Sequence, residues 1–458
     1  MLKISKRILA TILATVIVFT MADYSGINLL KENVSASTDQ NKYSDSKVVN
    51  EEIIPDTELR NALKDIISNG NDLTFKELKE YEGDLDLSNY PQIQEVTGLG
   101  YMRLVKNMDL STLSKVKKID KYEFQMCNLT SIKLPENLEE IDEAAFYRCE
   151  SLETVVLPDG LKKIHNDAFS RCTKLNNVTL PESLIKIGNG AFSVCESLES
   201  IKIPDYINAA LENSSDDSVN GLGTGVFDGC TALSNVTFGA AMTAIPAGFF
   251  RGTKALRKIA IPEQIIDIRN NAFGESGLYS IDLSKNTKMT TISGNVFNGC
   301  SSLYKVILPK SIERIEERAF WGTSVYDGLD KLTYIGDYAF LGCKFIEINM
   351  PDNIETIGFE AFKKCSLLQK VNFGEYTHEI KENTILSIGS EAFIECYNLT
   401  DVHFPSENQD NINFGIEILS KAFKNATNLH NVNFTSSITL IGESAFENCG
   451  AIKKEEVC

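Results

Sequence analysis

The 458-residue chain has few of the residues from which enzymes and metal sites are usually built. It contains four histidines, His165, His378, His403 and His430, and each lies in a different part of the sequence. It has no C-x-x-C pair, and no P-loop, G-x-G-x-x-G or H-E-x-x-H string occurs in a suitable context. These spacings cannot supply a nucleophile with its base and orienting group, and no paired carboxylate motif suggests a glycosidase. We therefore predict a protein that is not an enzyme and that binds no cofactor and no metal, with an exported hydrolase as a remote alternative.

Basic residues are also scarce. The chain has 45 Lys and Arg against 63 Asp and Glu, which gives a formal net charge of -18. Nucleic acids and anionic membranes both require a basic footprint on the protein that binds them. The sequence thus predicts no nucleic-acid partner, and its acidity mainly favours solubility.

Long apolar runs are absent except at the N-terminus. Three basic residues precede an apolar run from Ile8 to about Met21, which is typical of a secretory signal peptide and too short for a membrane span. We predict a signal peptide within residues 1–36, with cleavage after Ala22 or Ala36, and an uncleaved anchor as the alternative. We expect no stable membrane span after cleavage, and a location that is secreted or on the cell surface.

The segment after the signal peptide predicts a leader and a cap. Residues 37–52 are polar and lack periodicity, so we expect a flexible leader. Residues 53–122 should form a helical N-terminal cap followed by the opening repeats, with Asp56 as the N-cap of one helix and a capping box, Thr74 and Glu77, at the start of another. The apolar face of the first helix comprises Leu59, Ala62, Leu63, Ile66 and Ile67.

A repeated unit dominates the rest of the chain. The pairs Ala145-Phe146, Ala168-Phe169 and Ala191-Phe192 lie 23 residues apart, and prolines keep the same step. Fixed periods of this length indicate a solenoid, so we interpret residues 123–458 as one array. Within each repeat, L-x-x-V/I-x-L predicts a short strand and L-x-x-I predicts the return segment. The marker phenylalanines are Phe124, Phe146, Phe169, Phe192, Phe227, Phe250, Phe273, Phe297, Phe320, Phe340, Phe362, Phe393, Phe423 and Phe446.

Cysteines follow the repeat. Ten of the 11 lie three residues after a marker phenylalanine, and Cys458 alone does not. Where the cysteine is absent, the position holds a small residue, Thr253, Ser276, Thr323 or Ala426. We therefore predict a small buried side chain in the same notch of each coil. Disulfides between stacked coils and metal binding are the alternatives.

The consensus L-x-x-I-x-L-P-x-x-L-x-x-I-x-x-x-A-F-x-x-C resembles the BspA-like leucine-rich repeat over roughly residues 123–450, and residues 85–110 resemble the cap and first repeats of internalin-type proteins. The resemblance implies an α/β repeat solenoid: a leucine-rich-repeat array with a parallel β-sheet on the concave face and short strands, turns and helical segments on the return face. It also implies an adhesion module that is secreted by a bacterium or displayed on its cell surface, without shared catalytic residues.

Outward residues of the strands make a polar strip rich in Asn and Thr, which we predict as a surface for a protein or glycan partner. Trp321, the only tryptophan, is a further candidate anchor. The predicted function is adhesion to host matrix or cell-surface macromolecules, with an envelope scaffold as the alternative; three polar insertions, after Phe192, Phe362 and Phe393, could also carry recognition. The candidate partner-binding residues are Asn177, Thr179, Lys202, Asn235, Thr237, Lys305, Asn372, His403, Asn433 and Trp321. The oligomeric state is left open.

Overall fold

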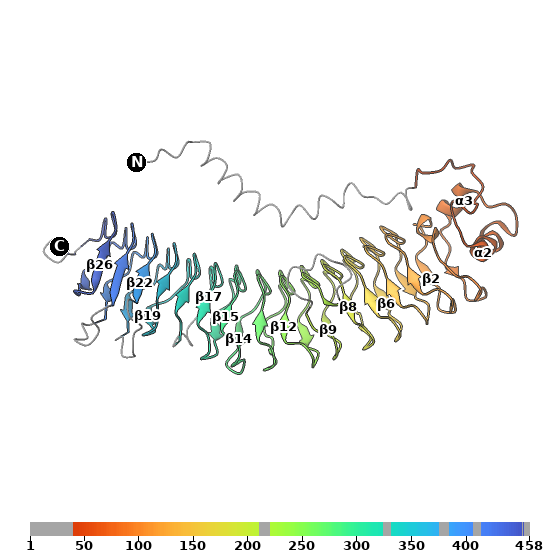
Figure 1. The fold of residues 1–458 in the computed structure, drawn as a ribbon. Helices are drawn as coiled ribbons and strands as arrows, with labels where there is room; N and C mark the ends of the chain where they lie inside the picture. Colours follow the sequence, from red (N-terminus) through yellow and green to blue (C-terminus); the bar gives the residue numbers. More distant parts are fainter. Residues whose placement is uncertain are drawn as a thin grey trace.

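The computed structural model describes residues 40–209, 220–323, 331–374, 384–405, 414–450 and 452. The predicted signal peptide, the middle of each insertion and Cys458 lie outside these ranges. The described chain forms an arched stack of coils with a helical cap at its N-terminal end (Figure 1). Parallel strands of successive coils line two flanks of the stack, which we call flank A and flank B. The predicted repeat solenoid is confirmed.

Flank A is built from the L-x-x-V/I-x-L segments. Its strands pair in parallel and in register, so Ile132 lies beside Val155 and both side chains are buried. Because side chains alternate along a strand, the residues on either side of each buried one face outward. The strands of flank A are β1 (Leu85–Asp86), β2 (Asn107–Asp109), β4 (Ser131–Lys133), β6 (Thr154–Val156), β9 (Ser200–Lys202), β11 (Asn235–Thr237), β14 (Ser280–Asp282), β16 (Lys305–Ile307), β19 (Glu347–Met350), β21 (Lys370–Phe373), β23 (Asp401–His403) and β25 (Asn431–Asn433).

Flank B is built from the L-x-x-I return segments, which pair in the same way: Ile141 lies beside Ile164, and both are buried. The strands of flank B are β3 (Lys118–Ile119), β5 (Glu140–Ile141), β7 (Lys163–Ile164), β8 (Lys186–Ile187), β10 (Gly221–Leu222), β12 (Ala244–Ile245), β13 (Asp267–Ile268), β15 (Thr291–Ile292), β17 (Arg314–Ile315), β18 (Tyr334–Ile335), β20 (Thr356–Ile357), β22 (Ile385–Ile388), β24 (Gly415–Ile418) and β26 (Ile438–Ile441).

The marker phenylalanines form a ladder through the core. Ring centroids of neighbouring markers lie 4.9 to 6.1 Å apart, and the rings of Phe146 and Phe169 are parallel within 1°. An α-helix is about 10 Å across, so coils at this spacing leave no room for one helix each. The described return segments accordingly consist of strands and turns, and the helices of the described chain lie in the cap.

The cysteine notch has a hydrogen-bonding role. The Cys149 thiol donates to the carbonyl of Phe124 in the preceding coil at 2.9 Å, and Cys172 donates to Phe146 at 3.2 Å. Burial raises the pKa of Cys149 to about 12, which keeps the thiol protonated and able to donate. Thr253 instead donates to the carbonyl of Phe250 in its own coil. The ten described cysteines are free thiols, and nine of them are buried while Cys449 is half-buried, so the predicted buried, packing role is confirmed for nine.

Two residues of each array turn, two before and two after the marker phenylalanine, adopt a left-handed backbone. Lys364 has φ 59°, whereas glycine, Gly342 with φ 70°, fills the same place in the preceding coil. A left-handed conformation costs a residue with a side chain about 1–2 kcal/mol, partly offset in comparison with glycine by the greater entropy that glycine loses on folding.

Lys364→Gly is therefore expected to raise stability by about 0.5–1 kcal/mol, seen as a higher melting temperature. Lys174, which is exposed and has no positive φ, is the matched control, and Lys174→Gly should lower the melting temperature. A fall in melting temperature for Lys364→Gly would contradict this reading of the turn.

The cap covers the first coil. Helix α2 (Thr57–Ser68) begins after Asp56, whose carboxylate accepts the Leu59 N–H at 2.9 Å. Helix α3 (Phe75–Glu80) begins with the predicted capping box of Thr74 and Glu77, and a 3₁₀ turn, η1 (Leu99–Tyr101), follows. Both predicted helix starts are confirmed.

Residues 40–52, which the sequence places in a flexible leader, pack against the cap in the structure. Tyr43 is buried with its ring 5.3 Å from that of Phe75, and the Val49 N–H donates to the Leu73 carbonyl at 2.8 Å. Two apolar side chains in a polar segment are enough to fasten it to the cap. The polar composition of the segment gave no indication that Tyr43 and Val49 would be buried.

Candidate binding surface

The middle of flank A gathers half of the predicted site residues. A cavity of about 450 Å³ lies over the outward face of β9 and β11 and the neighbouring coil, whose strand position is marked by a bridge between Thr154 and Asn177. Asn177, Thr179, Lys202, Asn235 and Thr237 all line this cavity. Register pairing puts them together, because Asn235 lies beside Ser200 and Thr237 beside Lys202.

Three polar side chains in this cavity are not used by the fold. Within the described chain, the side chains of Asn177, Thr179 and Thr237 make no hydrogen bond, and all three are exposed. Unengaged donors and acceptors repeated from coil to coil are able to bind a ligand that runs along the stack.

Toward the C-terminal end of flank A, equivalent side chains bond to one another. The Asn372 amide donates to Asn349 and to Glu347, each at 2.8 Å. Asn433 bonds to both backbone groups of Phe404. These predicted residues, together with Lys305 and His403, lie on flank A, but away from the cavity.

Lys202 is the one cation among the predicted residues in the cavity, and it is neutralised. It forms ion pairs with Glu182 and with Asp205. The hydrogen bond with Lys202 lowers the pKa of Glu182, and the same bond raises the pKa of Lys202, so both stay charged at neutral pH. Lys202 therefore positions the rim and offers little net charge to a partner.

Trp321 does not lie on this surface. It is 39% exposed in the turn after Phe320, and the Arg318 guanidinium lies 5.6 Å from its ring centroid. The structure thus separates the predicted aromatic anchor from the polar strip.

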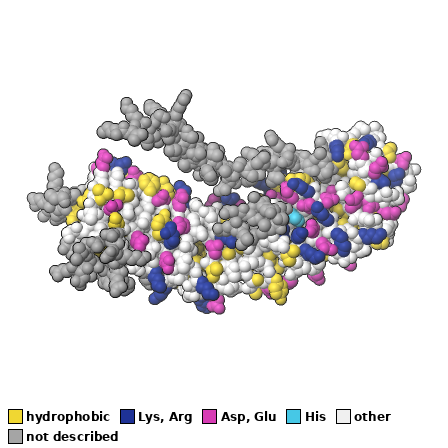
Figure 2. All heavy atoms as spheres, viewed as in Figure 1, with side chains coloured by type: hydrophobic (Ala, Val, Ile, Leu, Met, Phe, Trp, Pro, Cys, Tyr) yellow, Lys and Arg dark blue, Asp and Glu magenta, His cyan; other side chains and the backbone are white. Residues whose placement is uncertain are grey.

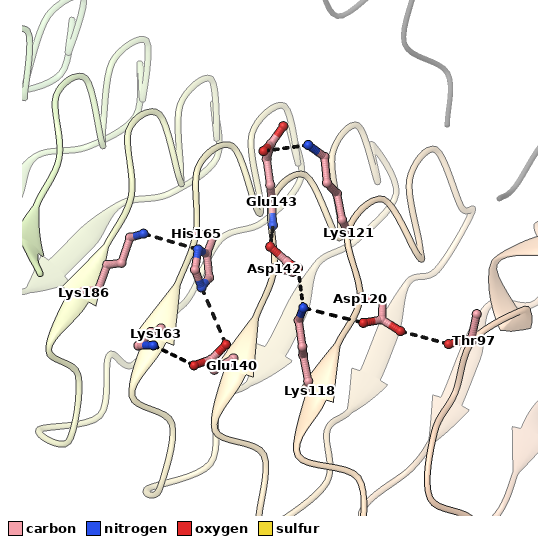
Figure 3. A network of polar contacts seen from close by, with 10 residues as sticks. All are labelled: Thr97, Lys118, Asp120, Lys121, Glu140, Asp142, Glu143, Lys163, His165 and Lys186. Atoms are coloured by element: carbon pink, nitrogen blue, oxygen red, sulfur yellow. Dashed lines mark hydrogen bonds and ion pairs between the residues drawn. The ribbon is translucent and has the colours of Figure 1, made fainter. Parts of the chain in front are cut away.

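Flank B carries charges that pair across coils (Figure 3). Lys118 lies 2.6 Å from Asp142, Lys121 lies 2.8 Å from Glu143, and Lys163 lies 2.8 Å from Glu140 in the preceding coil. His165 continues this network between Glu140 and Lys186. These ion pairs link neighbouring coils in the register that the buried strands adopt. Figure 2 likewise shows basic and acidic side chains interspersed over the face in view.

A second cavity, of about 530 Å³, adjoins the first and was missed at the level of the sequence. Leu134, Val156, Leu157 and Pro158 line it, and both cavities touch Asp159. Val156 is 70% exposed. The sequence did contain an indication of the exposed valine, since two consecutive valines in a strand must place one of them outward.

Within the described residues, no three His, Cys, Asp or Glu side chains are grouped to hold a metal ion. No described helix has the length and apolarity that crossing a bilayer requires.

Comparison with known proteins identifies the type of repeat. A family model for the BspA type leucine rich repeat region, six copies long, matches residues 102–215, 210–327 and 329–454. No protein with curated annotation matches the chain.

Solved structures with a similar fold include three proteins from bacteria. A leucine-rich repeat protein from Bacteroides ovatus is 25% identical, with 73% of this chain and 68% of that chain covered and a TM-score of 0.40. A leucine rich cell surface protein from Faecalibacterium prausnitzii is 23% identical, with 76% and 82% covered and a TM-score of 0.39. The pneumococcal vaccine antigen PcpA is 16% identical, with 72% and 85% covered and a TM-score of 0.42.

Proposed function

Since this chain belongs to the BspA-type leucine-rich-repeat family, we propose that it is a non-enzymatic binding protein whose partner is a protein or glycan held by the middle of flank A. Leucine-rich-repeat proteins generally bind macromolecular partners, because stacked coils repeat the same side-chain positions over a long surface. The observation that carries the proposal is the 450 Å³ cavity, in which the exposed side chains of Asn177, Thr179 and Thr237 make no hydrogen bond within the described chain.

The finer proposal is adhesion to host matrix or to the surface of other cells after export. The N-terminal sequence supports export, with basic residues ahead of the apolar run from Ile8 to Met21. The alternative is a scaffold in the producer's own envelope. Capture of a partner from a matrix extract would support adhesion, and capture of a partner from the producer's envelope would support the scaffold.

The triple variant Asn177→Lys, Thr179→Lys and Thr237→Lys is expected to weaken capture of the partner at least about tenfold. The longer lysine side chains would fill the cavity and remove the amide and hydroxyl groups available to a fitted ligand, and their charge would pair with the cavity's own Glu182 and Asp159. Surface plasmon resonance with the captured partner measures the change.

The matched control adds three lysines at outward strand positions of flank B, in Thr291→Lys, Thr356→Lys and Ser387→Lys. This control should bind as the native protein does. Equal affinity of the flank A variant and the native protein, with both folded by circular dichroism, would remove flank A as the site.

A further inference from the structure

A row of carboxylates borders flank A at the ends of its strands. Each carboxylate follows the proline that ends a strand, in four successive coils, and the row comprises Glu136, Asp159, Glu182 and Asp205. Glu182 and Asp205 share Lys202. Glu136 and Asp159 are exposed, and neither forms an ion pair within the described chain. The described lysine beside them, Lys133, is held by Asp109 at 2.7 Å.

An apolar floor lies beside these two carboxylates. Val156 is 70% exposed, and Leu134, Leu157 and Pro158 complete the lining of the 530 Å³ cavity. This cavity meets the 450 Å³ cavity at Asp159, and we call the two together the exit groove.

The exit groove has a definite length. Its lining residues run from Ser111 to Thr237, over six successive coils. Parallel strands lie about 4.8 Å apart, so the groove is about 24 Å long, and an extended polypeptide covers that distance in about seven residues.

The charges of the groove select its occupant. The lysines at its rim are already paired, so the carboxylates of Glu136 and Asp159 leave it with a net negative charge. A metal ion does not fit this role, because no group of three suitable side chains converges in the described residues. Anionic glycans would be repelled, and neutral ones could donate hydrogen bonds to the carboxylates but could not neutralise their charge, whereas a cationic segment does both.

We propose that the exit groove binds an extended, cationic polypeptide segment of about seven residues. One apolar side chain of the segment lies on Val156 and Pro158, and basic side chains pair with Glu136 and Asp159. The inference rests on the proposed function and names the chemistry of the partner.

Fluorescence anisotropy with a labelled eight-residue peptide tests the proposal. The probe carries three lysines around one leucine, and its counterpart carries glutamates in place of the lysines. The lysine peptide should bind, with an affinity that falls as salt is raised, and the glutamate peptide should not. Glu136→Gln with Asp159→Asn should weaken binding about fivefold to tenfold, and Val156→Ser should weaken it independently of salt.

The control variant changes two carboxylates outside the groove, Glu263→Gln with Glu355→Gln, and should bind as the native protein does. Glu263 also follows a strand-ending proline, so it matches the local setting. Equal binding of both peptides, binding of neutral dextran in place of the lysine peptide, or full affinity in the Glu136→Gln and Asp159→Asn variant would overturn the proposal. If the lysine peptide fails while the flank A triple variant still loses its partner, only the ligand class is wrong.

Discussion

Replacing Phe169 with alanine is expected to lower the free energy of unfolding by about 3–5 kcal/mol. Phe169 is fully buried, and its ring stacks between Phe146 at 5.0 Å and Phe192 at 5.2 Å. Alanine at this position would remove both ring contacts and leave a cavity that the stacked coils cannot close without losing register. Urea unfolding followed by circular dichroism measures the loss.

The damage should also be local. Each coil of a solenoid contacts only its neighbours, so hydrogen exchange should accelerate most in the coils on either side of position 169. Tyr304→Ala removes a ring that is 59% exposed and should cost less than about 1 kcal/mol. A loss for Phe169→Ala no larger than that of the control would contradict the continuous phenylalanine core.

Glu123→Gln is expected to stabilise the protein at alkaline pH and to leave it unchanged at pH 4. Glu123 is 2% exposed where the cap meets the array, and one carboxylate oxygen accepts the Gly98 N–H at 2.9 Å and the Gly100 N–H at 2.8 Å. Burial raises the pKa of Glu123 from 4.5 to about 7, although these two bonds oppose the rise.

The direction of this pH dependence follows from the linkage between proton binding and folding. Because the folded pKa lies above the unfolded value, the folded state favours the protonated acid, and stability is highest below pH 4.5 and falls as the pH rises to about 7. The full difference corresponds to about 3 kcal/mol. Glutamine keeps an acceptor for both glycine amides without the charge, so it avoids this loss.

Melting temperatures between pH 4 and pH 9 test the effect of Glu123. The native protein should lose stability as the pH rises from 4.5 to 7, and the difference in melting temperature between it and Glu123→Gln should increase over the same pH range. Glu139→Gln serves as the control, because Glu139 is partly exposed and its hydrogen bond with Lys162 lowers its pKa. Parallel pH profiles for the native protein and Glu123→Gln would contradict the account of this junction.

The fold could be predicted because its determinants recur. A phenylalanine and a small residue three positions later return in every coil, and only in-register stacking brings all of these side chains into one core. Residues 40–52 escaped prediction because single anchors such as Tyr43 leave no periodic trace.

The binding surface could be predicted only in part. Alternation along the strands placed Asn177 and Thr237 outward, and the cavity between them confirms that they lie together. The contrast between this region and the bonded asparagines near Asn372 depends on side-chain partners in neighbouring coils, which spacing does not specify. Val156 was overlooked because valine is ordinarily read as core.

The most direct test of the central claim, that equivalent outward residues line one flank in register, is a set of distances between paired spin labels. With one nitroxide at position 107, in β2, a second label at position 200, 258 or 305 lies four, six or eight coils away in the same outward column. At about 4.8 Å per coil, double electron–electron resonance should give distances between the labels of about 19, 29 and 38 Å. Distances that fail to rise with coil number would contradict the account.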